Sequence, residues 1–139
     1  MKKAFEVLDH TADIGIIAYG ADASELFSNA ALALFSLITE LETIQEKSHL
    51  DLEVRSQDRA SLLVDWLNEL IYSFDSKHIL LNRFDIENLT SNALKATCYG
   101  EDFDPNRHAI KMGVKAATYH MLKLDTDGSG YTAQIILDI

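Results

Sequence analysis

The chain has 139 residues, of which 47% are apolar and 24% are charged, with one proline and six glycines. This composition excludes disorder as the main state and predicts a single domain over residues 1–139, because a chain of this length can bury a sizeable core. The only cysteine, Cys98, excludes an internal disulfide and a cysteine-based zinc site, and it favours a cytoplasmic location.

The charge balance is strongly acidic: 12 Lys and Arg against 22 Asp and Glu give a net charge of −10. Nucleic acid is not expected as a direct partner, because each phosphate contact needs a cation and an acidic surface repels the backbone. Divalent cations or a basic protein surface fit this charge better. No membrane segment is expected, since the N-terminus lacks the apolar core of a signal peptide and no run of 18 apolar residues occurs.

The first half of the chain predicts two strands and a helix. Alternating apolar residues indicate strands over residues 5–8 and 14–19. Asp22, followed three residues later by Glu25, has the pattern of a capping box, and apolar residues then recur at helical spacing as far as Ile38. This spacing predicts a helix with one face in a core.

The remaining pattern predicts a second helix and mostly hairpins. The expected elements are a strand over 50–55, a helix with an apolar stripe over 62–74, a hairpin over 78–100, and a C-terminal hairpin with strands 117–124 and 131–139 around a turn at 125–130. Strands outnumber helices. The sequence therefore predicts an α+β fold, with a largely antiparallel sheet, two main helices packed on one face of it, and a C-terminal β-hairpin.

Two groups of acidic residues could hold a cation. The segment Asp9-His10-Thr11-Ala12-Asp13 places two carboxylates, an imidazole and a hydroxyl between two strands, although such residues also form turns that cap their own backbone. Calcium takes about 6–8 oxygen ligands, so further oxygens must come from elsewhere. Asp138 and the α-carboxylate of Ile139 offer them, although Asp138, on a face with Thr132, Gln134 and Ile136, could equally be a solvated surface charge.

The segment from Arg107 to Lys123 is the one basic part of this acidic chain. It holds four of the 12 Lys and Arg and two of the five His, and no acidic residue. Such a run is usually a solvated face. Its functional interpretation is an anion pocket, or a cationic counterpart to the acidic turn.

Two other classes of function are weighed against a binding protein. A metal-dependent hydrolase could use Asp13 with His10, His108 or His120, but no phosphate-binding loop, nucleophile elbow or metalloprotease helix motif is present. A general chaperone would expose a large apolar patch, which the sequence does not test. The missing motifs favour a protein that is not an enzyme.

Four segments together resemble the archease family: residues 5–15, 63–70, 114–120 and 136–139, which include the His-Thr-Ala-Asp turn and the Lys-Ala-Ala-Thr-Tyr-His run. The resemblance implies a small accessory protein of tRNA splicing. Such a protein stimulates guanylylation and multiple turnover of an RtcB-type RNA ligase, in the manner of a chaperone-like modulator, and tRNA methyltransferases are further clients that it implies.

The resemblance also assigns roles to individual residues. Asp13, Asp138 and the terminal carboxylate of Ile139 correspond to a divalent-cation site, with calcium expected and magnesium or manganese as alternatives. Lys115 corresponds to the residue that activates the partner, and His10 and His120 are expected to support the site.

Overall fold

The computed structural model describes residues 3–9 and 13–139. Its elements follow the chain in this order: β1 (Phe5–Asp9), β2 (Asp13–Gly20), α1 (Ala23–Ile38), the short 3-10 helix η1 (Leu41–Thr43), β3 (Ser48–Arg55), α2 (Arg59–Lys77), β4 (Ile79–Ile86), β5 (Ala93–Asp102), β6 (Ala116–Ala117), β7 (Lys123–Asp127) and β8 (Gly130–Asp138). Neither α1 nor α2 has both the length and the apolar character needed to cross a membrane, within the residues that the structure describes.

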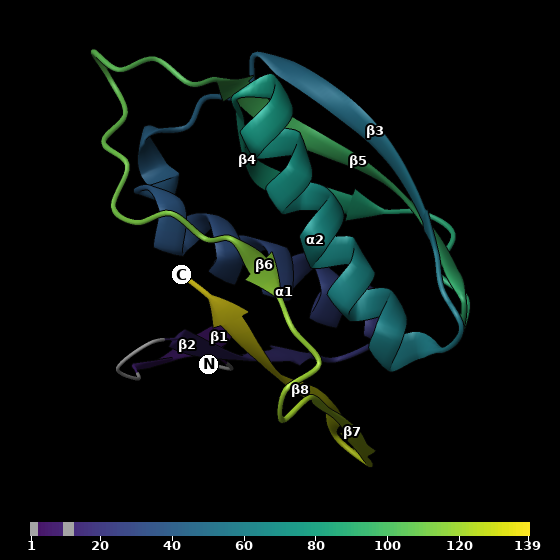
Figure 1. Cartoon of the computed structure of the whole chain (residues 1–139). Helices are drawn as coiled ribbons and strands as arrows, with labels where there is room; N and C mark the ends of the chain where they lie inside the picture. Colours follow the sequence, from purple (N-terminus) through teal and green to yellow (C-terminus); the bar gives the residue numbers. More distant parts are fainter. Residues whose placement is uncertain (1–2, 10–12) are drawn as a thin grey trace.

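The strands are antiparallel, which confirms the predicted α+β class, and they form two sheets (Figure 1). The larger sheet has the order β1-β2-β8-β6, with β7 also paired to β8, and the smaller has the order β3-β5-β4. The prediction of one sheet with both helices on one face therefore differs from the structure, because α1 contacts β2 of the larger sheet and β4 of the smaller.

The amino-acid content of α1 explains why two sheets are needed. Ten of its 16 residues are buried, so its apolar surface extends well beyond a single stripe. A helix of this kind must be covered from more than one side. The two sheets provide this cover, and the buried residues of both sheets and both helices form one hydrophobic cluster.

Local signals set both helix starts, and the sequence predicted the one at Asp22. The Asp22 carboxylate accepts a hydrogen bond from the Glu25 N–H at 2.8 Å, and the Glu25 carboxylate accepts one from the Ala21 N–H at 2.8 Å. Asp58 caps α2 in the same way, accepting from the Ser61 N–H at 2.8 Å. These bonds satisfy N–H groups that have no partner within the helix.

Aromatic residues link the helices to the smaller sheet. The indole N–H of Trp66 on α2 donates to the Phe27 carbonyl of α1 at 3.0 Å, and both side chains are fully buried. The ring of Phe84 on β4 lies 6.1 Å from that of Trp66 and 5.8 Å from that of Phe35. Cys98 is a buried core residue, as predicted, and burial raises the pKa of its thiol to about 12.

The C-terminal hairpin differs from the prediction in its first strand. A continuous strand over 117–124 is wrong, because β6 ends at Ala117 and β7 begins only at Lys123. Between them Met121 adopts a left-handed backbone conformation with φ 52°, and its carbonyl accepts a hydrogen bond from the Gln134 side chain at 3.0 Å. This backbone turn interrupts the ladder with β8.

The turn of this hairpin is also shorter than predicted. β7 continues through Asp127 and β8 begins at Gly130, so only Gly128 and Ser129 lie between them. The Asp127 carboxylate accepts hydrogen bonds from the Ser129 N–H at 2.7 Å and the Gly130 N–H at 3.1 Å. One side chain therefore closes the turn through backbone N–H groups, and residues 125–127 pair with β8 in the strand.

Candidate cation and partner site

Asp13 and Asp138 lie directly opposite each other in the register of β2 and β8. Directly opposite residues of an antiparallel pair project from the same face, with Cβ atoms about 4.5–5.5 Å apart. Asp13 is half-buried and Asp138 is exposed. The next residue, Ile139, is 37% exposed and carries the terminal carboxylate. The structure thus brings the start of β2 and the end of β8 together at one end of two inner strands of the larger sheet.

This pairing places two negative charges side by side. Like charges directly opposite each other in a sheet destabilise it by about 0.2–1 kcal/mol. Neither carboxylate has a cation within 4.0 Å among residues 3–9 and 13–139. Carboxylate oxygens are the preferred ligands of calcium and magnesium. The donor set therefore suits a divalent cation, which would convert the repulsion into attraction.

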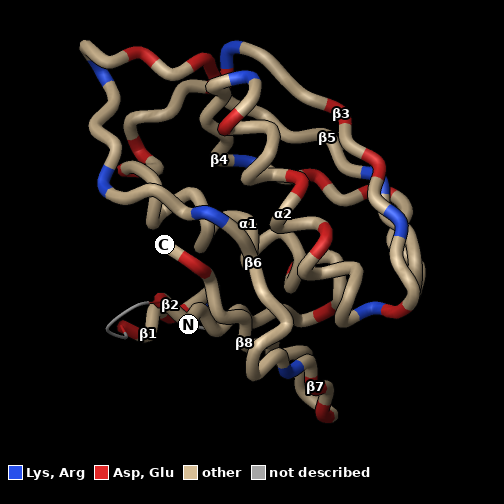
Figure 2. Tube along the Cα trace, in the orientation of Figure 1, with Lys and Arg blue, Asp and Glu red and all other residues tan. Residues whose placement is uncertain are grey.

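Lys115 adjoins this pair of carboxylates through its backbone. Its N–H donates to the Asp138 carbonyl at 2.8 Å, and the next residue, Ala116, pairs with Asp138 in β6. Figure 2 shows a basic position just before β6 and an acidic one at the end of β8. The Lys115 side chain is exposed and, among the residues that the structure describes, has no carboxylate within 4.0 Å. It is therefore available to a partner.

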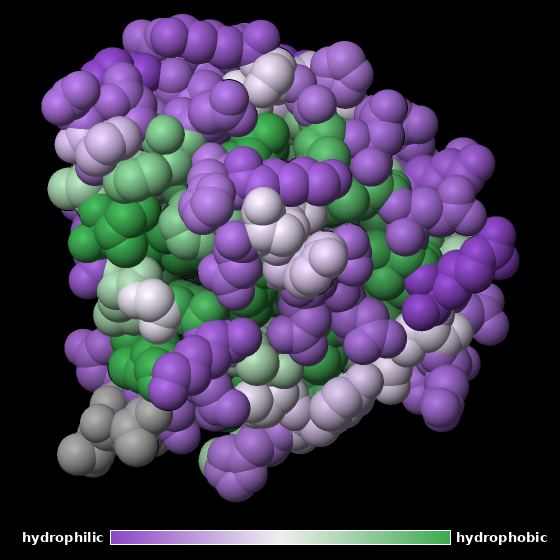
Figure 3. All heavy atoms as spheres, turned by 45° about the horizontal axis from the view of Figure 1, so that its top comes forward, coloured by the Kyte–Doolittle hydropathy of each residue, from purple (hydrophilic) through white to green (hydrophobic). Residues whose placement is uncertain are grey.

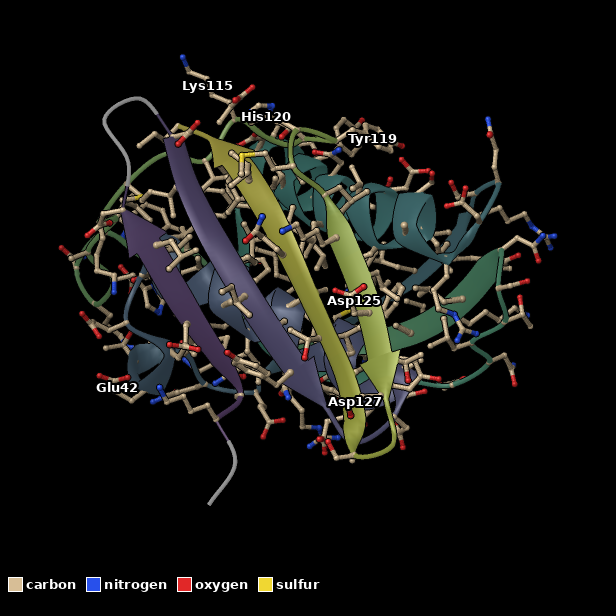
Figure 4. All side chains as sticks on the ribbon, turned by 90° about the horizontal axis from the view of Figure 1, so that it is seen from below. Glu42, Lys115, Tyr119, His120, Asp125 and Asp127 are labelled. Atoms are coloured by element: carbon tan, nitrogen blue, oxygen red, sulfur yellow. The ribbon has the colours of Figure 1, made fainter. Side chains whose placement is uncertain are left out.

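The three histidines proposed for the site have different positions. His10 lies outside the described residues. His120 is exposed, and Figure 4 shows it at the same end of the larger sheet as Lys115. His108 is buried in a separate cluster with Glu101. Within the described part of the chain, no three or more His, Cys, Asp or Glu side chains gather closely enough to hold a metal ion.

Glu101, a buried residue at the end of β5, pairs with Arg107. The Arg107 guanidinium donates to both carboxylate oxygens at 2.7 and 3.0 Å and to the Thr43 carbonyl at 2.8 Å. The Gln45 N–H donates to the same carboxylate at 2.7 Å. These hydrogen bonds, those from Arg107 above all, lower the pKa of Glu101 to about 2.

The hydrogen bonds of His108 identify its tautomer. Its Nδ1 accepts from the Asp104 N–H at 2.9 Å, so this nitrogen carries no proton. Its Nε2 lies 3.0 Å from Glu101 and must donate to that carboxylate. Both ring nitrogens are thus occupied, which argues against His108 as a metal ligand together with Asp13.

The basic segment is divided between structural and exposed cations. Arg107 is paired with Glu101, and the Lys111 ammonium lies 3.4 Å from the Glu40 carboxylate. The Lys111 N–H also donates to the Ile38 carbonyl at 2.7 Å, which anchors the segment to the end of α1. Only Lys115 and Lys123, of the four cations, lack a carboxylate within 4.0 Å in the part of the chain described. The four cations therefore do not converge on one anion pocket.

Sequence reasoning missed one residue at this site, Asn68 of α2. Its side-chain amide donates to the Ala117 carbonyl at 3.0 Å and accepts from the Ala117 N–H at 2.8 Å. Asparagine is unfavourable inside a helix, so its position within α2 was the one signal in the sequence that it has a role elsewhere. Two backbone groups of β6 are thereby held by one side chain.

Exposed apolar side chains gather in the same part of the chain. Six large hydrophobic residues are exposed among those described: Val7, Tyr72, Ile110, Tyr119, Met121 and Ile139. Four of them belong to the segment 110–121 or to the C-terminus. Figure 3 shows hydrophobic residues at the left of this face and also between hydrophilic residues across the rest of it. Singly exposed apolar side chains are ordinary on a protein surface.

Comparison with known proteins places the chain in a family. The sequence model of the archease protein family matches residues 5–139. The chain is 38% identical to protein archease of Methanosarcina mazei over 99% of this chain and 97% of that protein. The chain belongs to the archease family. Protein archease of Methanothermobacter thermautotrophicus is 40% identical, with 99% of both proteins covered.

Two solved structures share the fold of this archease. The solution structure of Methanobacterium thermoautotrophicum protein 1598 has a TM-score of 0.85 and 37% identity, and the match covers 98% of this chain and 99% of that one. The crystal structure of a Thermotoga maritima archease, described as a possible chaperone, has a TM-score of 0.67 over 100% of this chain and 98% of that one. Its identity of 24% supports the likeness of fold alone.

Proposed function

We propose that this archease is an accessory protein of tRNA splicing that stimulates guanylylation and multiple turnover of an RtcB-type RNA ligase. It acts through a divalent cation held by Asp13, Asp138 and the terminal carboxylate of Ile139, with Lys115 directed to the partner. Family membership supports the choice of partner. The observation that carries the proposal is the direct opposition of Asp13 and Asp138, with the backbone of Lys115 bonded to Asp138.

A cation at these strand ends has an incomplete set of protein ligands. The two side-chain carboxylates and the terminal carboxylate offer at most six oxygen atoms on an open surface, and calcium takes about 6–8. Water or the partner protein supplies the remaining ligands. Calcium fits this loose arrangement best, since magnesium and manganese prefer octahedral geometry and magnesium retains several waters.

The charge of the archease favours a protein over RNA as its partner. A protein of net charge −10 is repelled by RNA, whereas a ligase that binds RNA must have a basic face. Lys115 is an exposed cation next to the carboxylate pair, and its ammonium can reach a phosphate of the nucleotide that the ligase uses. A tRNA methyltransferase, which also needs a basic RNA-binding face, is a further client of the same kind.

The test is multiple-turnover RNA ligation by the ligase, with the archease added in trans. Asp13→Ala, Asp138→Ala and Lys115→Ala are expected to fold and to lose most of the stimulation. Asp125→Ala and Lys123→Ala are matched controls, because both residues are exposed on the neighbouring strand β7. Stimulation by all three site variants at the wild-type level, or equal loss in the controls, contradicts the proposal.

A further inference from the structure

The strand β6 lies at the edge of the larger sheet and consists only of Ala116 and Ala117. On one side it pairs with β8, where Ala117 lies opposite Leu137. Beyond it, the Thr118 N–H and hydroxyl both donate to the Ile136 carbonyl, at 3.0 and 2.8 Å. Before it, residues 103–115 contain no helix or strand. The backbone groups of so short a strand need hydrogen-bond partners on the side away from β8.

Asn68 of α2 supplies that support. Its carboxamide exchanges two hydrogen bonds with Ala117, donating at 3.0 Å and accepting at 2.8 Å. A primary amide has the same donor and acceptor as a peptide group, so the Asn68 side chain acts as a one-residue substitute for a further strand. Ala117 is only 6% exposed, and a buried peptide group without a partner costs about 1–3 kcal/mol.

The cost of Asn68 to the helix supports a role outside α2. Asparagine within a helix is less favourable than alanine by roughly 0.7 kcal/mol. Within the described part of the chain, the Asn68 side chain makes no hydrogen bond other than the two with Ala117. The Asn68 carboxamide therefore stabilises β6 and not α2.

We propose that Asn68 is a positioning residue that holds Lys115 at the carboxylate pair. Lys115 lies two residues before Ala117, and its N–H donates to the Asp138 carbonyl at 2.8 Å. Asn68 and β8 together hold Ala117 in place. Because β6 has only two residues, this also holds its first residue and the Lys115 backbone just before it. The link from this position to ligase stimulation rests on the proposed function; the position itself is a property of the isolated chain.

Asn82 provides a matched control for the removal of an amide. It is also half-buried, and its side chain donates to two backbone carbonyls, those of Leu41 at 3.4 Å and Ile44 at 2.8 Å. It lies on β4, in the smaller sheet, where it has no connection to β6. Asn82→Ala therefore removes comparable hydrogen bonds without touching the candidate site.

The experiment compares Asn68→Ala, Asn68→Asp and Asn82→Ala by amide hydrogen exchange and by ligation at a temperature where all three are folded. Asn68→Ala is expected to speed exchange of the Lys115 and Ala117 amides at least tenfold and to lower stimulation at saturating archease at least tenfold. Asn68→Asp, which keeps the acceptor but sets a carboxylate oxygen against the Ala117 carbonyl, is expected to speed this exchange as well. Asn82→Ala should leave the Lys115 amide and the stimulation unchanged.

Unchanged exchange at Lys115 in Asn68→Ala, or an equal loss of stimulation in Asn82→Ala, overturns the positioning role. Failure of the proposed function looks different. In that case wild-type archease does not stimulate the ligase, whereas faster exchange at Lys115 in Asn68→Ala still supports the positioning role.

Discussion

Replacing Asp13 or Asp138 by asparagine is expected to stabilise the protein in EDTA and to reduce its stabilisation by a divalent cation. The two carboxylates are directly opposed across β2 and β8. Coulomb's law gives about 0.8 kcal/mol for two unit charges about 5 Å apart in water, within the range of about 0.2–1 kcal/mol for like charges opposed in a sheet. Because Asp138 is exposed, we expect about 0.5 kcal/mol, or about 2 °C in the melting temperature.

Binding of a divalent cation should make wild type more stable than the asparagine variants. A ligand that binds only the folded state at 100 times its dissociation constant stabilises it by about 2.7 kcal/mol. Wild-type protein should gain this stability when calcium replaces EDTA, and each asparagine variant should gain much less. The variants are therefore expected to melt above wild type in EDTA and below it in calcium.

Thermal melts of four proteins in both buffers test this expectation. Asp125→Asn is the fourth, because it removes one negative charge from an exposed strand position opposite the uncharged Thr132. This control corrects for the general repulsion in a chain of net charge −10. Lower stability of both site variants in EDTA would refute the repulsion argument, and equal gains from calcium in all four proteins would refute the site.

Three further predictions concern the rest of the fold. The pKa of Glu101 falls from 4.5 to about 2 on folding. Its ionised form therefore contributes on the order of 3 kcal/mol to the free energy of unfolding above pH 4.5, and this contribution is lost as the pH falls toward 2. Glu101→Gln should reduce the loss of stability that wild type shows in melts between pH 7 and pH 3. The Cys98 thiol, with a pKa of about 12, should react with a thiol reagent at pH 8 only at the rate of unfolding, and faster reaction would contradict its burial. A Cβ at Gly100 would collide with the Leu80 carbonyl, so Gly100→Ala should destabilise the protein by about 3 kcal/mol in urea unfolding, whereas Gly113→Ala, which meets nothing within 4 Å, should not.

Two polar arrangements illustrate what sequence reasoning does not reach. Glu101 is the next-to-last residue of β5, and nothing near it along the chain indicates that its carboxylate is buried and accepts a hydrogen bond from the Gln45 N–H, 56 residues away. The same holds for Asn68, whose partner is 49 residues away. Such bonds join segments that come together only in the folded chain, so they have no local pattern.

The helices and most strands were determined by the sequence itself. Asp22 and Asp58 cap helices whose hydrogen bonds close within four residues, and the alternation over β2, β5 and β8 depends only on which side chains face a core. Tertiary structure decided the rest: the division into two sheets around α1, the break between β6 and β7, and the register that sets Asp13 against Asp138. Pairing between distant strands depends on packing over the whole molecule, because a shift of one residue turns every side chain to the other face.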